Sequence, residues 1–244
     1  AILIAGTSLL LMFIGRVNTK HILITMGIAM IPLILLISIA VTTYDKETHE
    51  TKKLPAFLAS GRIPTWISRI QTFLYSNKED DNEKMYQINQ AKIAIASGGW
   101  LGKGPGNSAA RNYLPHSYSD FIYAIIIEEY GLLGATVMLF IYLLFLYRCI
   151  RLYRKCPFAF GAFLALALSF TLVIQAIANM GVNVNLFPNT GVTLPLVSMG
   201  GSSFLFTCLS IGIILSVARN VEQLEGKVQP QVVETASEEE KEPA

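Results

Sequence analysis

Long runs of apolar residues dominate the chain and predict helices that cross a membrane. A helix needs about 20 consecutive apolar residues to span the hydrocarbon core of a bilayer. Residues 22–41 form such a run, and Pro32 within it predicts a kink rather than an end. A second run covers residues 121–147. The run at 1–14 is shorter, so we interpret it as the latter part of a span and expect the chain to be a fragment of something longer.

A long uncharged block predicts two further spans. The 63 residues between Lys155 and Arg219 contain no Asp, Glu, Lys or Arg, and this length is too great for one span. A segment rich in glycine and proline at 179–203 divides the block, so we expect spans near 159–180 and 204–218. The pattern therefore predicts an all-α polytopic membrane protein with about five transmembrane helices in this chain.

Composition and charge agree with this class. Of the 244 residues, 52% are hydrophobic and 15% are charged, whereas soluble domains are roughly 25% charged. This excludes an ordinary soluble globular protein, and the 3 cysteines exclude a disulfide-stapled secreted scaffold. The formal net charge is only +2, and the basic residues form no continuous patch, so no nucleic-acid partner is indicated.

Basic residues in the short loops predict the orientation and the domain boundaries. They cluster after the first, third and last spans, which the positive-inside rule places in the cytoplasm. We therefore expect two helices in 1–42, a large extracytoplasmic loop in 43–119, and three helices with an outer Gly/Pro-rich turn in 120–221. The acidic residues 222–244 are expected to form a disordered cytoplasmic tail.

The outer loop carries two helical patterns and a glycine-rich segment. Residues 63–74 have the spacing of an amphipathic helix on a membrane surface, and residues 85–97 predict a helix that ends at Gly98. The glycine-rich segment, residues 98–108, superficially resembles a phosphate-binding loop, but its spacing does not fit the Walker motif. A backbone nest for a phosphate and a turn without a ligand both stay open.

Asp120 stands at the outer mouth of the third span. Ser117 and Asp120 have the spacing of a capping box, and an acid in the first turn suits the helix dipole, so a purely structural role is one interpretation. The functional alternative is a carboxylate at the lipid–water boundary that accepts a proton as a base. The residues alone leave both open.

Glu128 and Glu129 are the two acids within the predicted span. With ~1.5 Å of rise per residue they lie about 12–14 Å from Asp120, inside the hydrocarbon. An ionisable side chain there costs at least ~2.5 kcal/mol unless it is paired or faces water. Glu128 lies about 80° from Asp120 around the helix, so we expect it to share a wet cavity with Asp120 and Glu129 to pair with another helix. A structural ion pair is the alternative for both.

A series of short motifs runs in order across most of residues 60–220. They are Tyr86–Gln87, Ser97–Gly99, Gly102–Ser108 with Arg111, Leu114–Pro115, Ser119–Tyr123, Glu128–Gly131, Leu194–Pro195 and Gly200–Ser203. Together these motifs closely resemble the SEDS family (shape, elongation, division and sporulation). Residues 179–182 and 194–196 look more like the division branch than the elongation branch.

The resemblance implies a protein of about ten transmembrane helices, of which this chain would hold roughly the last half. It implies a peptidoglycan glycosyltransferase that polymerises lipid II at the outer face of the bacterial cytoplasmic membrane, releasing undecaprenyl pyrophosphate, in septal wall synthesis. The implied partners are lipid II, undecaprenyl-linked glycan, a class B penicillin-binding protein as transpeptidase, and other membrane proteins of the division machinery. A lipid II flippase or transporter and a non-catalytic scaffold of that machinery are the alternatives.

The resemblance also assigns the site. It maps the family's catalytic acid onto Asp120, which we expect to act as a base. Lys103 and Arg111 would supply positive charge to the pyrophosphate, with Arg111 standing where the family usually has Lys. The other expected substrate contacts are Ser108, Glu128, Ser202 and Ser203. His116, Tyr118 and Met199 depart from the family pattern. No acidic cluster has a metal spacing, so no cofactor is assigned, and a requirement for a divalent cation is left open.

Overall fold

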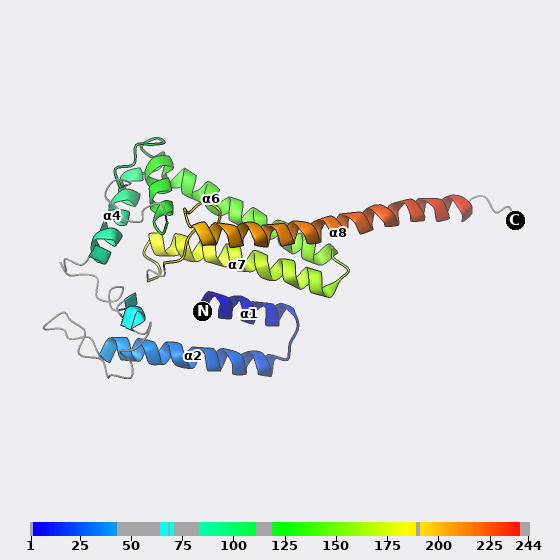
Figure 1. Cartoon of the computed structure of the whole chain (residues 1–244), viewed down its shortest axis with the longest axis horizontal. Coiled ribbons are helices and arrows are strands. Elements are labelled where there is room, and N and C mark those ends of the chain that lie inside the picture. The colour runs from blue at the N-terminus through cyan, green and yellow to red at the C-terminus, as the bar shows by residue number, and fades with distance from the viewer. Residues whose placement is uncertain are drawn as a thin grey trace.

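Helices form where the apolar runs predict them. The computed structural model describes residues 2–42, 64–67, 69–70, 83–110, 119–188 and 191–239. Its longer elements are α1 (Ile2–Ile14), α2 (Thr19–Thr42), α4 (Glu83–Gly98), α6 (Ile122–Lys155), α7 (Ala159–Asn183) and α8 (Gly201–Glu239), shown in Figure 1. These described ranges contain no strand, and the all-α prediction is confirmed.

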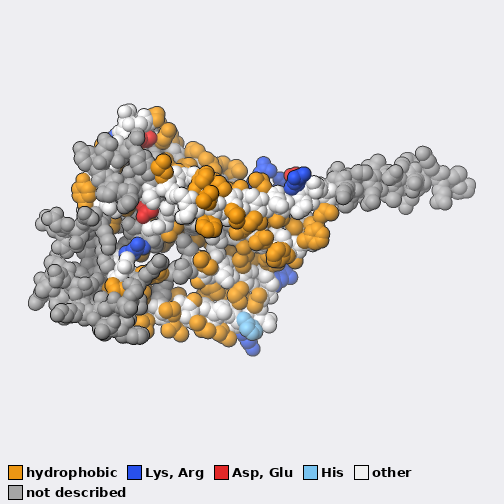
Figure 2. All heavy atoms as spheres, in the orientation of Figure 1, with side chains coloured by type: hydrophobic (Ala, Val, Ile, Leu, Met, Phe, Trp, Pro, Cys, Tyr) orange, Lys and Arg blue, Asp and Glu red, His pale blue; other side chains and the backbone are white. Residues whose placement is uncertain are grey.

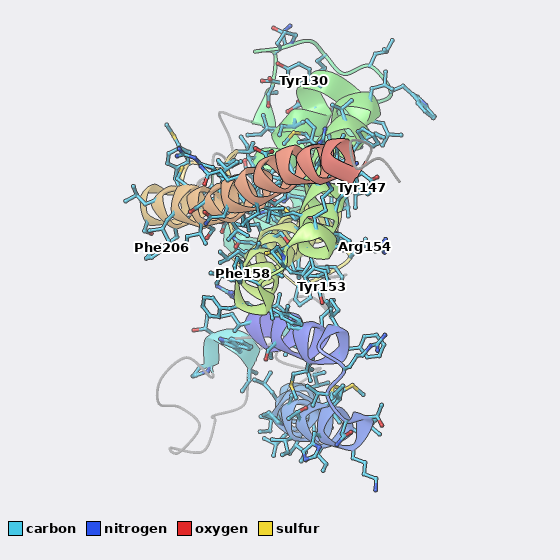
Figure 3. All side chains as sticks on the ribbon, turned by 90° about the vertical axis from the view of Figure 1, so that its right-hand side faces the viewer. Tyr130, Tyr147, Tyr153, Arg154, Phe158 and Phe206 are labelled. Carbon is cyan, nitrogen blue, oxygen red and sulfur yellow. The ribbon has the colours of Figure 1, made fainter. Side chains whose placement is uncertain are left out.

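Within the described residues, four stretches are long and apolar enough to cross a membrane: Thr19–Ile39 within α2, all of α6 and α7, and Gly201–Leu224 within α8. Pro32 lies inside α2 without ending it. Hydrophobic side chains cover much of the visible face of these helices in Figure 2. Large aromatic side chains such as Tyr147 and Phe206 are exposed and point away from the bundle (Figure 3). Such surfaces suit contact with lipid, where each helix satisfies its own backbone hydrogen bonds.

The central helix of the bundle is α7, which contacts α6, α8 and α1. Its buried face is rich in small side chains, including Ala162, Ala165 and Ala176. Small residues let neighbouring helices approach closely, which favours packing inside a membrane where burial from water supplies little driving force. The same helix also buries two amides, Asn179 and Asn183, near its C-terminal end.

The two ends of the bundle differ in the way that the charge pattern predicts. The short connections from α1 to α2 and from α6 to α7 lie at one end, toward which the apolar part of α8 also runs, and α4 lies at the other (Figure 1). The sequence places basic residues in and beside these short connections, among them Arg16, Lys20 and Lys155. One end of the bundle therefore collects the basic loops, as a positive-inside orientation requires.

One predicted boundary agrees with the structure and another differs from it. α4 ends at Gly98 as predicted, and residues 64–67 and 69–70 are helical within the predicted surface helix, the rest of which lies outside the described residues. The acidic tail differs from the prediction, because α8 continues to Glu239 instead of giving way to disorder at 222. Glu, Gln, Lys and Ala in this stretch are good helix formers, whereas Gly226 and Pro230 are poor ones, and extending an existing helix avoids the unfavourable nucleation step.

The helix α6 is interrupted at Gly131, whose backbone is non-helical (φ 68°, ψ −166°). The stretch before Gly131 lies at an angle to the stretch after it (Figure 1). The rise from Asp120 to Glu128 and Glu129 is unaffected, because both acids precede Gly131, but their predicted depth in the hydrocarbon assumed one straight helix across the membrane. Both acids lie at the interruption, where non-helical backbone must find partners elsewhere in the protein.

Candidate functional site

The glycine-rich segment packs onto the interruption in α6. In a continuous helix the amides of Leu132 and Leu133 would donate to the carbonyls of Glu128 and Glu129. The segment supplies substitutes for both sets of groups. Its backbone hydrogen bonds with α6 are Lys103 N–H to Glu128 O (2.9 Å), Gly104 N–H to Glu129 O (2.9 Å), Leu132 N–H to Gly99 O (3.0 Å) and Leu133 N–H to Trp100 O (3.4 Å).

Two glycines make this approach of backbones possible. A Cβ atom on Gly102 would lie 2.2 Å from the carbonyl oxygen of Glu129, and one on Gly131 would lie 2.4 Å from that of Trp100. Both glycines also have positive φ, 78° and 68°, which L side chains disfavour. The glycine pattern is therefore explained by a tight docking turn, which was the structural alternative to a phosphate nest.

The carboxylate of Glu128 fixes the same segment from inside. Glu128 is 1% exposed, and a buried carboxylate requires several hydrogen-bond donors. The donors are Lys103 Nζ (2.7 Å), Ser108 Oγ (2.6 Å), Ser97 Oγ (3.3 Å), and the amides of Ala109 (3.3 Å) and Ala110 (3.2 Å). Three predicted substrate contacts, Lys103, Ser108 and Glu128, are thus brought together, but chiefly to bind one another. This matches the structural ion pair that the sequence offered as the alternative.

A pocket of about 230 Å³ lies between α4 and this cluster. Its lining includes Tyr86, Gln90, Ser97, Lys103 and Glu128, and the side chain of Lys103 is 39% exposed. Asp120 does not line it. This pocket does not join Glu128 to Asp120, so the expectation that the two acids share one cavity stays a prediction. Glu129 is half-buried, and its predicted ion pair with another helix does not occur within the described ranges.

Two asparagines of α7 hold the backbone of Asp120 in place. Its carbonyl oxygen accepts hydrogen bonds from Asn179 Nδ2 (3.1 Å) and Asn183 Nδ2 (3.0 Å), both from buried side chains of α7. The Oδ1 atom of Asn183 accepts the amide of Ala124 at 3.3 Å. The same amide also donates to the Phe121 carbonyl at 3.1 Å, so a side chain of α7 adds a second acceptor to an amide in the first turn of α6.

The carboxylate of Asp120 does not cap α6. The N-cap position is Phe121, which makes no side-chain capping bond, and Asp120 Oδ1 accepts its hydrogen bond from Ser119 Oγ (2.9 Å). Ser117, the other half of the predicted capping box, lies outside the described residues. Asp120 is half-buried at the start of the helix. The capping explanation for this acid thus receives no support from the described residues.

Gly191 lies beside this carboxylate and beside a cation. Its φ is +66°, and a Cβ atom placed on it would lie 3.7 Å from Asp120 Oδ2 and 3.6 Å from Arg69 Nη2. Arg69 belongs to the predicted surface helix and is half-buried. The sequence predicted the helix but gave Arg69 no role, because nothing in its spacing points to Asp120.

The structure describes some of the remaining predicted substrate contacts. Ser203 Oγ lies 2.8 Å from Thr193 Oγ1, and Ser202 is exposed in the first turn of α8. Ser198 joins the Gly/Pro-rich turn to the residue before Asp120, since its Oγ donates to the carbonyl of Ser119 at 2.6 Å. Arg111, His116 and Tyr118 lie outside the described residues, and Met199 is exposed.

Sequence reasoning missed Asn179, Asn183 and Ser198 as supports of Asp120. A signal for the two asparagines exists, because they are polar residues four apart in a helix without charged side chains, and such residues inside a membrane need partners. Ser198, in a turn, carries no such signal. Within the described residues no group of three His, Cys, Asp or Glu side chains could hold a metal ion.

The helices, the interruption and the half-buried acid define a polytopic membrane protein with a site at one end of its bundle. The family model FTSW_RODA_SPOVE, described as cell cycle protein, matches residues 1–223. The chain belongs to this family, which confirms the predicted SEDS membership.

Relatives named for the division branch are similar over much of this chain. The probable peptidoglycan glycosyltransferase FtsW of Thioalkalivibrio sulfidiphilus is 36% identical over 222 residues, which cover 89% of this chain and 54% of the relative. The protein of the same name from Nitrosococcus halophilus is 40% identical over 158 residues, covering 63% and 41%. Stage V sporulation protein E of Bacillus subtilis is 38% identical over 157 residues, covering 64% and 43%. The chain spans about half the length of these relatives.

A solved structure shares the fold. It was described under the subject "structural coordination of polymerization and crosslinking by a peptidoglycan synthase complex", and it matches 87% of this chain and 53% of its own with a TM-score of 0.59. The sequence identity is 21%, so the likeness concerns the fold alone.

Proposed function

We propose that this chain forms part of a peptidoglycan glycosyltransferase that polymerises lipid II at the outer face of the bacterial cytoplasmic membrane, at the division septum. Family membership and the names of the relatives support the reaction class. The observation that carries the proposal is the way in which Asp120 is held at the start of α6. Its backbone is fixed by two buried amides, while its half-buried carboxylate is not used to cap the helix.

The chemistry needs a base at the acceptor. The C4 hydroxyl of one lipid II attacks the anomeric carbon of the growing strand, an O–C bond forms, and the bond from that carbon to the diphosphate breaks. Undecaprenyl diphosphate leaves with the bonding electrons, and the hydroxyl proton passes to the Asp120 carboxylate. A positioned base of this kind contributes roughly 10²–10⁴-fold to a rate.

The other predicted site residues take supporting roles in this proposal. Lys103, Ser108 and Glu128 hold the glycine-rich segment in place, and Arg111 follows Ala110, whose amide is bound by Glu128. The cluster therefore fixes the start of the segment that carries Arg111, which would contact the diphosphate. Ser202 and Ser203, at the start of α8, would contact the sugar or diphosphate. The five hydrogen bonds to the Glu128 carboxylate favour a structural role for this acid over one in a transport path.

The test uses the intact membrane protein, purified and supplied with lipid II, with products separated by size. Wild type should form glycan strands, whereas Asp120→Asn should form none at unchanged expression and unfolding temperature. Glu222→Gln, an exposed acid on α8, serves as the control and should polymerise normally. Undiminished strands from Asp120→Asn would overturn the base assignment.

Other outcomes would support other classes of protein. Headgroup translocation without polymer would indicate a flippase. A silent Asp120→Asn together with effects of outer-surface variants would indicate a scaffold.

We include a class B penicillin-binding protein among the proposed partners. The fold neighbour described above comes from a complex that combines polymerization with crosslinking, which supports such a pairing. Copurification with the transpeptidase, and polymerisation measured with and without it, tests this partner. A divalent cation would act as a counter-ion of the diphosphate, and polymerisation in the presence of EDTA tests that requirement.

A further inference from the structure

The cation Arg69 and the proposed base Asp120 both lie beside Gly191. Arg69 Nη2 and Nη1 lie 3.6 Å and 3.9 Å from the position of a Cβ atom on Gly191, and Asp120 Oδ2 lies 3.7 Å from it. The guanidinium and the carboxylate come from segments far apart in the sequence. A glycine between them keeps the intervening space free of a side chain.

We propose that Arg69 is a diphosphate-binding residue of the reaction centre. It would hold the diphosphate of the undecaprenyl-linked donor while Asp120 faces the acceptor hydroxyl. This inference rests on the proposed function and deepens it, because it names the group that binds the leaving diphosphate.

The geometry of the reaction favours such a pair. In a displacement at the anomeric carbon, the base touches the incoming oxygen and the cation stabilises the departing diphosphate, so the two groups must face the site from different sides with the reacting atoms between them. A guanidinium is planar and always charged, and it binds phosphate oxygens through two parallel N–H bonds. Arg69 is half-buried, and partial exclusion of water strengthens such a contact.

The predicted cation Lys103 is less well placed for this role. Its Nζ is bound to Glu128 Oε1 at 2.7 Å, and the pocket that it lines does not include Asp120. Arg111 lies outside the described residues. Arg69, by contrast, lies beside Gly191, as the carboxylate of Asp120 does.

The test measures binding in an Asp120→Asn background, so that turnover does not interfere. The intact protein is titrated with undecaprenyl diphosphate and with undecaprenol, which differ only in the diphosphate. Arg69→Gln should weaken the diphosphate ligand by on the order of tenfold or more, and Arg69→Lys should lose part of that affinity because a single ammonium replaces the two-pronged contact. Undecaprenol binding should stay unchanged in both variants.

The control is Arg154→Gln, an exposed arginine in the last turn of α6, labelled in Figure 3, which should bind both ligands as before. Equal loss of both ligands in Arg69→Gln would show that Arg69 only shapes the fold. Unchanged affinity for the diphosphate would also overturn the proposal. If diphosphate binding depends on Arg69 but the protein with Asp120 intact makes no polymer, this site stands and the proposed function fails.

A glycine pair tests the space between the two charges. Gly191→Ala and Gly99→Ala both place a Cβ atom at positive φ (+66° and +56°). The Cβ atom at position 191 would lie within 4 Å of Arg69 and Asp120, whereas the Cβ atom at position 99 would have no neighbour within 4 Å. Both variants should lose similar stability from backbone strain. Only Gly191→Ala should weaken undecaprenyl diphosphate binding, and equal binding losses would contradict the assignment.

Discussion

The side-chain amide of Asn183 joins two helices at the proposed base. Its Nδ2 donates to the carbonyl of Asp120 at 3.0 Å, and its Oδ1 accepts the amide of Ala124 at 3.3 Å. One buried amide of α7 thus caps the first turn of α6 and fixes the residue in front of it. The orientation of Asp120 therefore depends on the packing of α7 against α6.

Removing this amide should affect both stability and rate. Asn183→Ala leaves the Asp120 carbonyl with one fewer donor, and Ala124 N–H keeps only the Phe121 carbonyl as acceptor, so unfolding should become easier by about 1–3 kcal/mol. The turnover number should fall while KM for lipid II changes little. The variant would displace the base Asp120 but leave the groups that bind the substrate unchanged. Thermal unfolding and initial rates measure the two effects. Asn220→Ala, an exposed amide on α8, should change stability by less than about 0.5 kcal/mol.

The Lys103–Glu128 pair should behave as a coupled unit. Lys103→Met removes one donor from a carboxylate that is 1% exposed and should lower stability by roughly 1–3 kcal/mol. Glu128→Gln should have a similar effect. The double variant should lose less than the sum, with a coupling of about 0.5–3 kcal/mol in unfolding measurements. Lys20→Met, an exposed lysine at the other end, is the control, and strictly additive losses would argue against the coupling.

The interruption of α6 should tolerate no side chain. Gly131→Ala would place Cβ 2.4 Å from the carbonyl oxygen of Trp100 at a φ of +68°, so we expect a loss of at least about 2 kcal/mol in thermal unfolding. Gly212→Ala on α8 meets nothing within 4 Å, and it should be neutral or stabilising by up to about 1 kcal/mol. A harmless Gly131→Ala would mean that the glycine-rich segment is not docked there.

Arg111 should matter for substrate use more than for folding. Arg111→Ala should reduce kcat/KM for lipid II strongly at nearly unchanged unfolding temperature, and Arg111→Lys, which restores the residue usual in the family, should keep part of the activity. Arg148→Ala, an exposed arginine at the opposite end of α6, should leave both quantities unchanged. Parallel losses of stability and turnover in Arg111→Ala would instead indicate a structural role.

The position of each helix could be predicted because it depends on local composition. A membrane span requires a long apolar run, and the uncharged block between Lys155 and Arg219 admits few other solutions. The end of α4 at Gly98 follows from a local glycine signal in the same way. The continuation of α8 beyond 222 was missed because an acidic composition suggests disorder, whereas attachment to a long helix favours more helix.

The sequence by itself determined the membrane class, the helices, the family and the candidate acid Asp120, since apolar length and motif order do not depend on how the helices pack. Only the tertiary structure decided that Gly131 interrupts α6, that Glu128 faces Lys103 and Ser108, and that Asn183 holds Asp120. The contact of Arg69 with the same site was also invisible in the pattern. The reason is physical: each of these partners is distant in the sequence, and a hydrogen bond or close approach between distant residues exists only after the helices have packed.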